Sequence, residues 1–323
     1  EFRRVLFRSS FKEDLKWPED KDEIFKCIEI ADIIHVHQAI DLKENKLGIN
    51  FYELLKQGKK FVRQWHSVPE HYMEWLGVSP SDFKEDFPHL VVSQYHERFY
   101  PWAVPVPNII CNSLIDSSYN ESFDWRTPKI VFSPSNKNSP VKKRWASKGY
   151  HETLRILDRV KRSTGVEFEV LFDTPHDEVI SAKSKCTIVI DDIVTGSYHR
   201  SGLEGLALGK ATFSYLDQRT ATTLGIITGT STNPFILSSA RSLEEMLKAV
   251  IKLPDLGKSI GDFSRIWFKK FYDEEIMIRH YMNVYKKVLS ENDLEGLFPS
   301  RADHSFLFKT QYDIAHKYNL GDL

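Results

Sequence analysis

The segment from Thr187 to Leu216 constrains the fold more than any other part of the chain. It begins as a β-branched run that ends at Asp191 and Asp192, and continues through a glycine-bearing loop, a short apolar helix pattern and a second strand pattern. Strand, loop, helix and strand form the unit of a parallel sheet, whose ligands bind beyond the carboxyl ends of the strands. The exposed helix N-terminus would suit a phosphate. These residues predict either a nucleotide or sugar-phosphate site, or an ordinary crossover whose glycines only permit a tight turn.

Strand and helix patterns alternate in two blocks of the chain. This predicts an α/β protein with two doubly wound, Rossmann-like domains that face a cleft. The 323 residues are enough for two domains of ordinary size. We expect a first domain over 10–122 and a second domain over 123–289. The second domain includes a closing helix over 273–289, and the tail over 290–323 is assigned no structure.

The N-terminal end has an unusual sequence. Residues 1–9, EFRRVLFRS, look like a translated sequencing adaptor and are left out of the fold interpretation. Few residues then precede the strand that starts near Asp32. A βαβ unit takes about 30 or more residues, so we expect roughly 30–60 native residues to be missing. On this expectation the first domain is incomplete and its sheet has too few strands.

Composition excludes several classes of protein. The net charge is -1, and it becomes -3 without the adaptor-like residues, because those carry a net charge of +2. Neither value implies a nucleic-acid partner. The three cysteines are far apart and lack metal-ligand spacing, which suggests a reducing compartment. No apolar run is long enough to span a bilayer. We expect a cytoplasmic protein, and peripheral contact with the inner face of the membrane stays open.

The stretch from Gly196 to Lys210, GSYHRSGLEGLALGK, resembles the donor-binding loop and helix of GT-B glycosyltransferases, particularly family 4. In that family two glutamates separated by seven residues bracket the loop. Glu204 matches the second glutamate, which in the family holds the ribose of the nucleotide. Gly196 stands at the position of the first, which is a departure, although a subset of the family carries a glycine in this loop. The resemblance also implies donor contacts from the amides near Ser201 and Gly202.

A basic loop precedes the first helix of the second domain. In the resembled family, one cation near the end of the first strand and the lysine of a Lys-Gly pair hold the donor diphosphate. Lys148 and Gly149 match that pair, and the first cation is either Lys137 or Arg144, because an insertion blurs the register. Such cations stabilise the charge that grows on a departing phosphate. The alternative is a solvated basic loop.

Three histidines follow predicted strands of the first domain. His66 lies where many family 4 members place a histidine near the donor sugar; the alternative is a loop histidine bonded to the backbone. His35 and His37 share one face of a strand. Together the three could suggest a metal, but nothing supplies a carboxylate or thiolate at useful spacing. We therefore expect no metal and no cofactor. We also expect Asp192 to face a loop and to be structural.

The resemblance implies a glycosyltransferase that moves a hexose or a derivative from a nucleotide-diphosphate sugar to a glycan or lipid-linked glycan. The acceptor would bind to the first domain, over 10–122, and the nucleotide sugar to the second, over 123–289. With the first domain incomplete, the chain should bind nucleotide but show poor or no transfer. Family 4 membership would imply retention of the anomeric configuration, with the leaving phosphate helping to deprotonate the acceptor. Glu204 should then affect nucleotide affinity more than folding. One alternative is a nucleotide-sugar epimerase of similar architecture. The other is a degenerate sugar-nucleotide-binding protein, which the glycine at position 196 favours.

Overall fold

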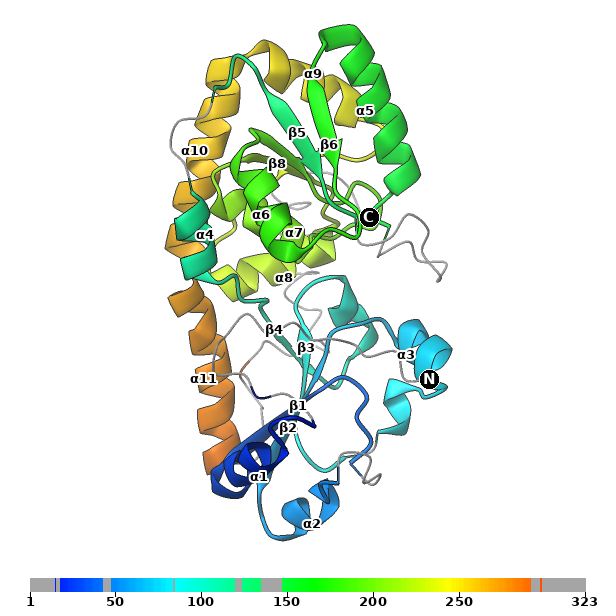
Figure 1. Cartoon of the computed structure of the whole chain (residues 1–323), viewed down its shortest axis with the longest axis vertical. Coiled ribbons are helices and arrows are strands. Elements are labelled where there is room, and N and C mark those ends of the chain that lie inside the picture. Colours follow the sequence, from blue (N-terminus) through cyan, green and yellow to red (C-terminus); the bar gives the residue numbers. More distant parts are fainter. Residues whose placement is uncertain are drawn as a thin grey trace, which may run out of the picture.

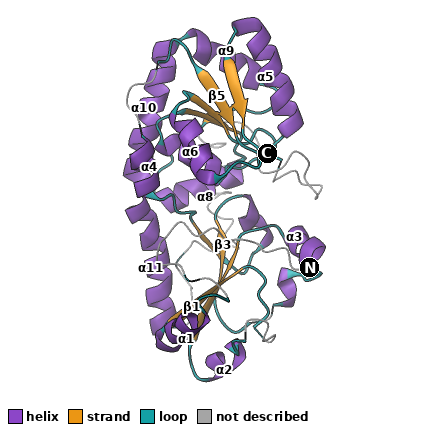
Figure 2. Cartoon of the chain, viewed as in Figure 1, coloured by secondary structure: helices purple, strands orange, loops and turns teal. Residues whose placement is uncertain are grey.

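The computed structural model describes residues 15, 18–42, 48–83, 85–119, 124–134, 147–291 and 297. Within these ranges the chain forms two lobes, one above the other in Figure 1, each built around a parallel sheet with helices. Figure 2 shows the same division by secondary structure. The α/β prediction of two Rossmann-like domains is confirmed.

The first domain has a parallel sheet whose described strands are in the order β1-β2-β3-β4. Its elements are α1 (Lys21–Ile30), β1 (Ile33–His37), α2 (Phe51–Lys56), β2 (Lys60–Trp65), α3 (Pro69–Leu76), η1 (Pro80–Asp82), β3 (His89–Val92), η2 (Tyr95–Phe99), β4 (Val104–Val106) and α4 (Asn112–Ser118). Strands β2 and β3 are almost entirely buried, as expected of inner strands covered on both faces.

The second domain has a parallel sheet in the order β6-β5-β7-β8-β9. Its elements are β5 (Lys129–Phe132), α5 (Tyr150–Thr164), β6 (Glu167–Val170), α6 (His176–Ser184), β7 (Ile188–Ile190), α7 (Arg200–Ala207), β8 (Ala211–Ser214), α8 (Gln218–Thr228), β9 (Ile236–Leu237), α9 (Leu243–Lys252), α10 (Pro254–Phe271) and α11 (Glu274–Ser290). Side chains alternate between the two faces of a strand, so Ile188 and Ile190 pack with α5 and α9 while Val189 faces the opposite side.

Helix α11 covers part of the first domain although in sequence it is the last element after the second sheet (Figure 1). Val284 and Val288 pack on Val62 and Leu90 of the first sheet. Burying such aliphatic side chains contributes roughly 1.5–3 kcal/mol each. Helix α11 therefore connects the two domains by packing on the sheet of the first. Among the described helices, none has the length and apolar character needed to cross a bilayer.

Candidate functional site

The carboxyl ends of strands from both sheets meet at one cavity of about 490 Å³. This volume is in the range of small-molecule sites. The first domain supplies His66, Val92, Gln94, His96 and Asn108, each of which ends or follows one of β2, β3 and β4. The second domain supplies Ser133, Pro134, Lys148, Leu171, Asp173, Thr174, His176, Val179, Lys183, His199, Arg200, Ser201 and Glu204. The cavity therefore lies where the parallel-sheet rule places a ligand.

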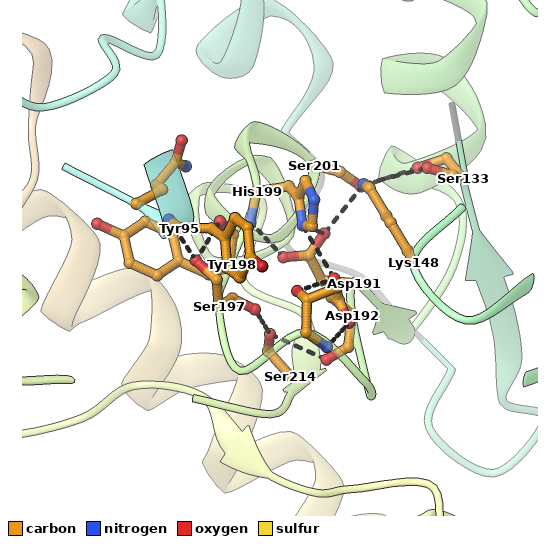
Figure 3. Close-up of polar contacts among 12 residues, drawn as sticks. Tyr95, Ser133, Lys148, Asp191, Asp192, Ser197, Tyr198, His199, Ser201 and Ser214 are labelled. Atoms are coloured by element: carbon orange, nitrogen blue, oxygen red, sulfur yellow. Dashed lines mark hydrogen bonds and ion pairs between the residues drawn. The ribbon is translucent and has the colours of Figure 1, made fainter. Parts of the chain in front are cut away.

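Lys148 enters this cavity from the turn before α5. Lys148 and Gly149 both have positive φ, at 49° and 71°, so the chain turns sharply just before the helix. A Cβ at Gly149 would lie 2.7 Å from a methyl of Val194, which explains why glycine stands there. The turn buries the Lys148 side chain, whose Nζ donates to Asp191 Oδ1 at 3.1 Å and to Ser133 O at 3.2 Å (Figure 3). An ammonium has three N–H donors, and these two acceptors among the described residues use two of them.

Asp191, at the end of β7, is the buried counter-ion of Lys148. Its other oxygen accepts from the His199 backbone N–H at 2.6 Å, just before α7 (Figure 3). Burial alone would raise the pKa of Asp191, but the Lys148 charge and the His199 contacts outweigh it and hold the pKa well below its usual range. A Cβ at Gly202 would lie 2.6 Å from Asp191 Oδ2, so this glycine makes room for the carboxylate.

Asp192 has a different role. Its carboxylate accepts from the backbone N–H groups of Val194 and Thr195 and from the Thr195 hydroxyl. It therefore fixes the loop after β7, in agreement with the structural role predicted for it. Both aspartate carboxylates also approach His199 Nδ1, Asp191 Oδ1 at 3.5 Å and Asp192 Oδ2 at 3.8 Å.

Glu204 lies in α7 and is buried, with 3% of its surface exposed. Lys183 Nζ donates to Glu204 Oε2 at 2.7 Å, and His176 Nε2 lies 2.8 Å from Oε1. Burial alone would raise the pKa of Glu204, but chiefly the Lys183 charge, together with the His176 contacts, lowers it to about 2. Glu204 is therefore ionised and held in one position at the wall of the cavity.

Lys183 links Glu204 to the start of α7. Besides Glu204, its ammonium donates to the Ser201 carbonyl at 3.1 Å and to Ser201 Oγ at 3.0 Å. Ser201 Oγ lies 2.8 Å from Ser133 Oγ at the end of β5. The first N–H groups of a helix have no partner within the helix. The first turn of α7 therefore brings N–H donors, a hydroxyl and an ionised carboxylate to one side of the cavity.

His66 lines the cavity from the first domain, directly after β2. Its Nε2 lies 2.8 Å from Nδ1 of His37, the last residue of β1. The His37 ring stacks on His35, and His35 Nδ1 lies 2.8 Å from the Tyr285 hydroxyl of α11. Burial, and to a lesser extent the neighbouring His37, lowers the pKa of His66 to about 4. At neutral pH His66 is therefore an uncharged imidazole.

Neither Gly202 nor Gly196, the two predicted donor-binding glycines, is in the cavity lining. Gly196 stands at the position of the first family glutamate. Its φ is +80°, and a Cβ there would lie 2.9 Å from Asp217 Oδ2. Its carbonyl accepts from the Asp217 N–H. A glutamate at this position would need a left-handed backbone and would collide with Asp217, which gives a physical reason for the departure from the family pattern. Lys137 and Arg144 lie outside the described residues.

Polar contacts across the cleft hold the two domains together beside the cavity. Arg219 of α8 forms a bidentate ion pair with Glu97 of η2, with N···O distances of 2.6 and 2.9 Å. Arg98 Nη2 donates to Asp217 at 2.9 Å. The Tyr95 N–H donates to Ser197 Oγ at 2.9 Å (Figure 3). These contacts join the loop after β3 to the loop after β7 and to the start of α8.

Sequence reasoning missed several polar residues of the cavity wall. Lys183 gave no signal, because a lysine on a polar helix usually faces solvent. Gln94 also gave none. His37, which contacts His66 but is not in the cavity lining, gave a weak one, since it ends a strand beside His66. Across the described residues, no group of three or more histidine, cysteine, aspartate or glutamate side chains is arranged to hold a metal ion.

Comparison with known proteins shows the fold but no close relative. No protein-family model and no curated protein sequence matches the chain. Its structure is similar to that of a glycosyltransferase from Rickettsia africae, with a TM-score of 0.52, 16% identity and coverage of 88% of this chain and 84% of the other. It is also similar to an alpha-glucosyltransferase in complex with UDP and a 13-mer DNA, with a TM-score of 0.58, 12% identity and coverage of 83% of each chain.

At these identities the similarity establishes architecture. The chain has the fold of the GT-B glycosyltransferases, with two Rossmann-like domains on either side of a cleft. A fold of this kind hosts more than one chemistry, so the function has to be argued from the cavity.

Proposed function

We propose that this protein is a glycosyltransferase that transfers a hexose from a nucleotide-diphosphate sugar. The observation that carries the proposal is the single cavity in which Lys148, Ser201 and Glu204 of the second domain face His66 of the first. Cationic and N–H donors suit a diphosphate, and a carboxylate suits ribose hydroxyls. The fold similarity to solved glycosyltransferases supports the same assignment.

Each residue has a separate role in this proposal. The third N–H of Lys148 and the first turn of α7 hold the diphosphate, whose charge grows as the bond from the sugar to phosphate breaks. Asp191 holds Lys148 in place and offsets its charge. Glu204, fixed by Lys183, accepts from the ribose. His66 contacts the transferred sugar as a neutral imidazole.

The finer parts of the proposal follow from the sequence resemblance to family 4. Transfer occurs with retention, and the leaving phosphate takes the proton of the acceptor hydroxyl on the same face of the sugar. The acceptor is a glycan or lipid-linked glycan that binds against the first domain, at the inner face of the membrane in the lipid-linked case. No metal or other cofactor takes part.

Ligand binding followed by product analysis tests the proposal. Thermal unfolding with UDP, GDP and ADP should reveal one diphosphate that raises the melting temperature, because a ligand stabilises the folded state that it binds. The matching labelled nucleotide sugar should then be hydrolysed or transferred. Isomerisation of the sugar would indicate an epimerase, and binding without turnover would indicate a degenerate binding protein. No stabilisation by any of the three would contradict the proposal.

A further inference from the structure

Gln94 occupies a position in the cavity wall that the roles above do not explain. It follows β3, and its side chain is buried, with 3% of its surface exposed, yet it lines the cavity. Asn108 lines the cavity beside it and follows the neighbouring strand β4. The two strands are parallel partners, with Val92 opposite Val106, so their following residues emerge at the same edge of the sheet.

Gln94 makes a hydrogen bond through the oxygen of its side-chain amide. Asn108 Nδ2 donates to Gln94 Oε1 at 2.7 Å. The oxygen therefore faces Asn108, and Nε2 is directed away from it. Gln94 Nε2 is buried and has no hydrogen-bond partner among the described residues. Leaving a buried donor without a partner is destabilising, so such a group in a cavity wall indicates a partner supplied by a ligand.

The surroundings of this amide indicate the kind of ligand. The first-domain wall around it consists of the side chains of Asn108 and Val92 and the imidazoles of His66 and His96. Both imidazoles are uncharged at neutral pH, because burial lowers their pKa well below the usual value. The described cationic groups of the cavity, Lys148, Lys183 and Arg200, come from the second domain. A phosphate would therefore bind toward the second domain. An uncharged group rich in hydroxyls fits the wall that contains Gln94.

We propose that Gln94 Nε2 donates a hydrogen bond to a hydroxyl of the glycosyl group of the donor, and that Asn108 holds the amide in the required orientation. Gln94 is then a specificity-determining residue for the transferred sugar. This inference rests on the proposed function. It assigns the hydroxyl to the donor sugar rather than to the acceptor, because the same cavity contains the diphosphate-binding groups.

Calorimetric titration without acceptor tests the inference. The ligands are three matched pairs: UDP and UDP-glucose, GDP and GDP-mannose, and ADP and ADP-glucose. Gln94→Met removes the donor. Gln94→Glu keeps an oxygen for Asn108 but replaces the donor with an acceptor. Gln57→Met, at an exposed glutamine after α2, is the control. For the pair that the parent protein binds, both Gln94 variants should bind the nucleotide sugar about three- to tenfold more weakly. Their affinity for the nucleoside diphosphate should stay unchanged.

Monodeoxy analogues of the bound sugar give a second readout. The parent should bind one analogue more weakly than the intact donor, and Gln94→Met should not distinguish the two, because the hydrogen bond is already lost. Equal losses for diphosphate and nucleotide sugar, or no loss for either, would overturn the inference while leaving the proposed function intact. An effect only on the KM of the acceptor would overturn it as well. Failure of the parent to bind any of the six ligands would overturn both.

Discussion

His37 Nδ1 and His66 Nε2 lie 2.8 Å apart across the ends of β1 and β2. One ring must donate and the other accept, so the tautomer of His37 decides whether His66 presents an N–H or a lone pair from its other nitrogen. His37 is therefore a positioning residue for His66. The stack of His37 on His35, and the contact of His35 with Tyr285, extend this arrangement to α11.

The first prediction concerns the pKa of His66. In the parent protein an NMR titration should give a midpoint near 4 rather than the usual 6.5. Because the folded-state pKa is depressed, the unfolded state takes up this proton first, and stability should decline as the pH falls from about 6.5 toward 4. His37→Ala removes the second of the two causes and should raise the midpoint. His151→Ala, on the exposed side of α5, should leave it unchanged. A His66 midpoint near 6.5 in the parent would contradict the description of the pair.

The second prediction concerns Glu204 and Lys183. Glu204→Leu would leave the buried Lys183 ammonium without its counter-ion, so we expect it to lower stability as well as nucleotide affinity. Either Glu204→Leu or Lys183→Met should lower the free energy of unfolding by about 3–5 kcal/mol. The double variant should cost much less than the sum of the two. Chemical denaturation measures all three, and additive losses would show that the pair is not coupled.

The third prediction concerns Lys148. Lys148→Ala should weaken the binding of nucleoside diphosphate far more than that of the nucleoside, because the proposed contact is with phosphate. It should also raise the pKa of Asp191, since burial would no longer be opposed by the lysine charge. Lys185→Ala, at an exposed position after α6, is the control. Equal losses for both ligands would indicate a general defect of the domain.

The fourth prediction concerns Gly196, which stands at the position of the first glutamate of the family pattern. Gly196→Ala and Gly229→Ala both place an alanine at positive φ, +80° and +67°, but only the first meets other atoms. Gly229→Ala should cost about 1–2 kcal/mol from backbone strain alone. Gly196→Ala should cost more, because its Cβ approaches Asp217. Gly196→Glu should not increase transfer. Equal unfolding free energies for the two alanine variants would remove the steric explanation for this departure from the family.

The sequence by itself determined the alternation of strands and helices, and with it the two parallel sheets, because β-branched runs and amphipathic periods are local properties. It also indicated which residues follow strands. His66 and Asp191 could be placed near a site because parallel strands expose their carboxyl ends at one edge. The Lys-Gly pair was found only through the resemblance to family 4.

The tertiary structure alone decided which of these residues meet. The pairs Lys148–Asp191 and Lys183–Glu204 are separated in sequence by 43 and 21 residues, and the pair Asn108–Gln94 by 14. No local pattern selects these partners, because a lysine or glutamine carries the same local preferences whether it is buried or solvated. Burial then determines their charge and orientation. The sequence could indicate a phosphate-binding edge, but the packing of the two domains against each other defined the cavity and the direction of each group in its wall.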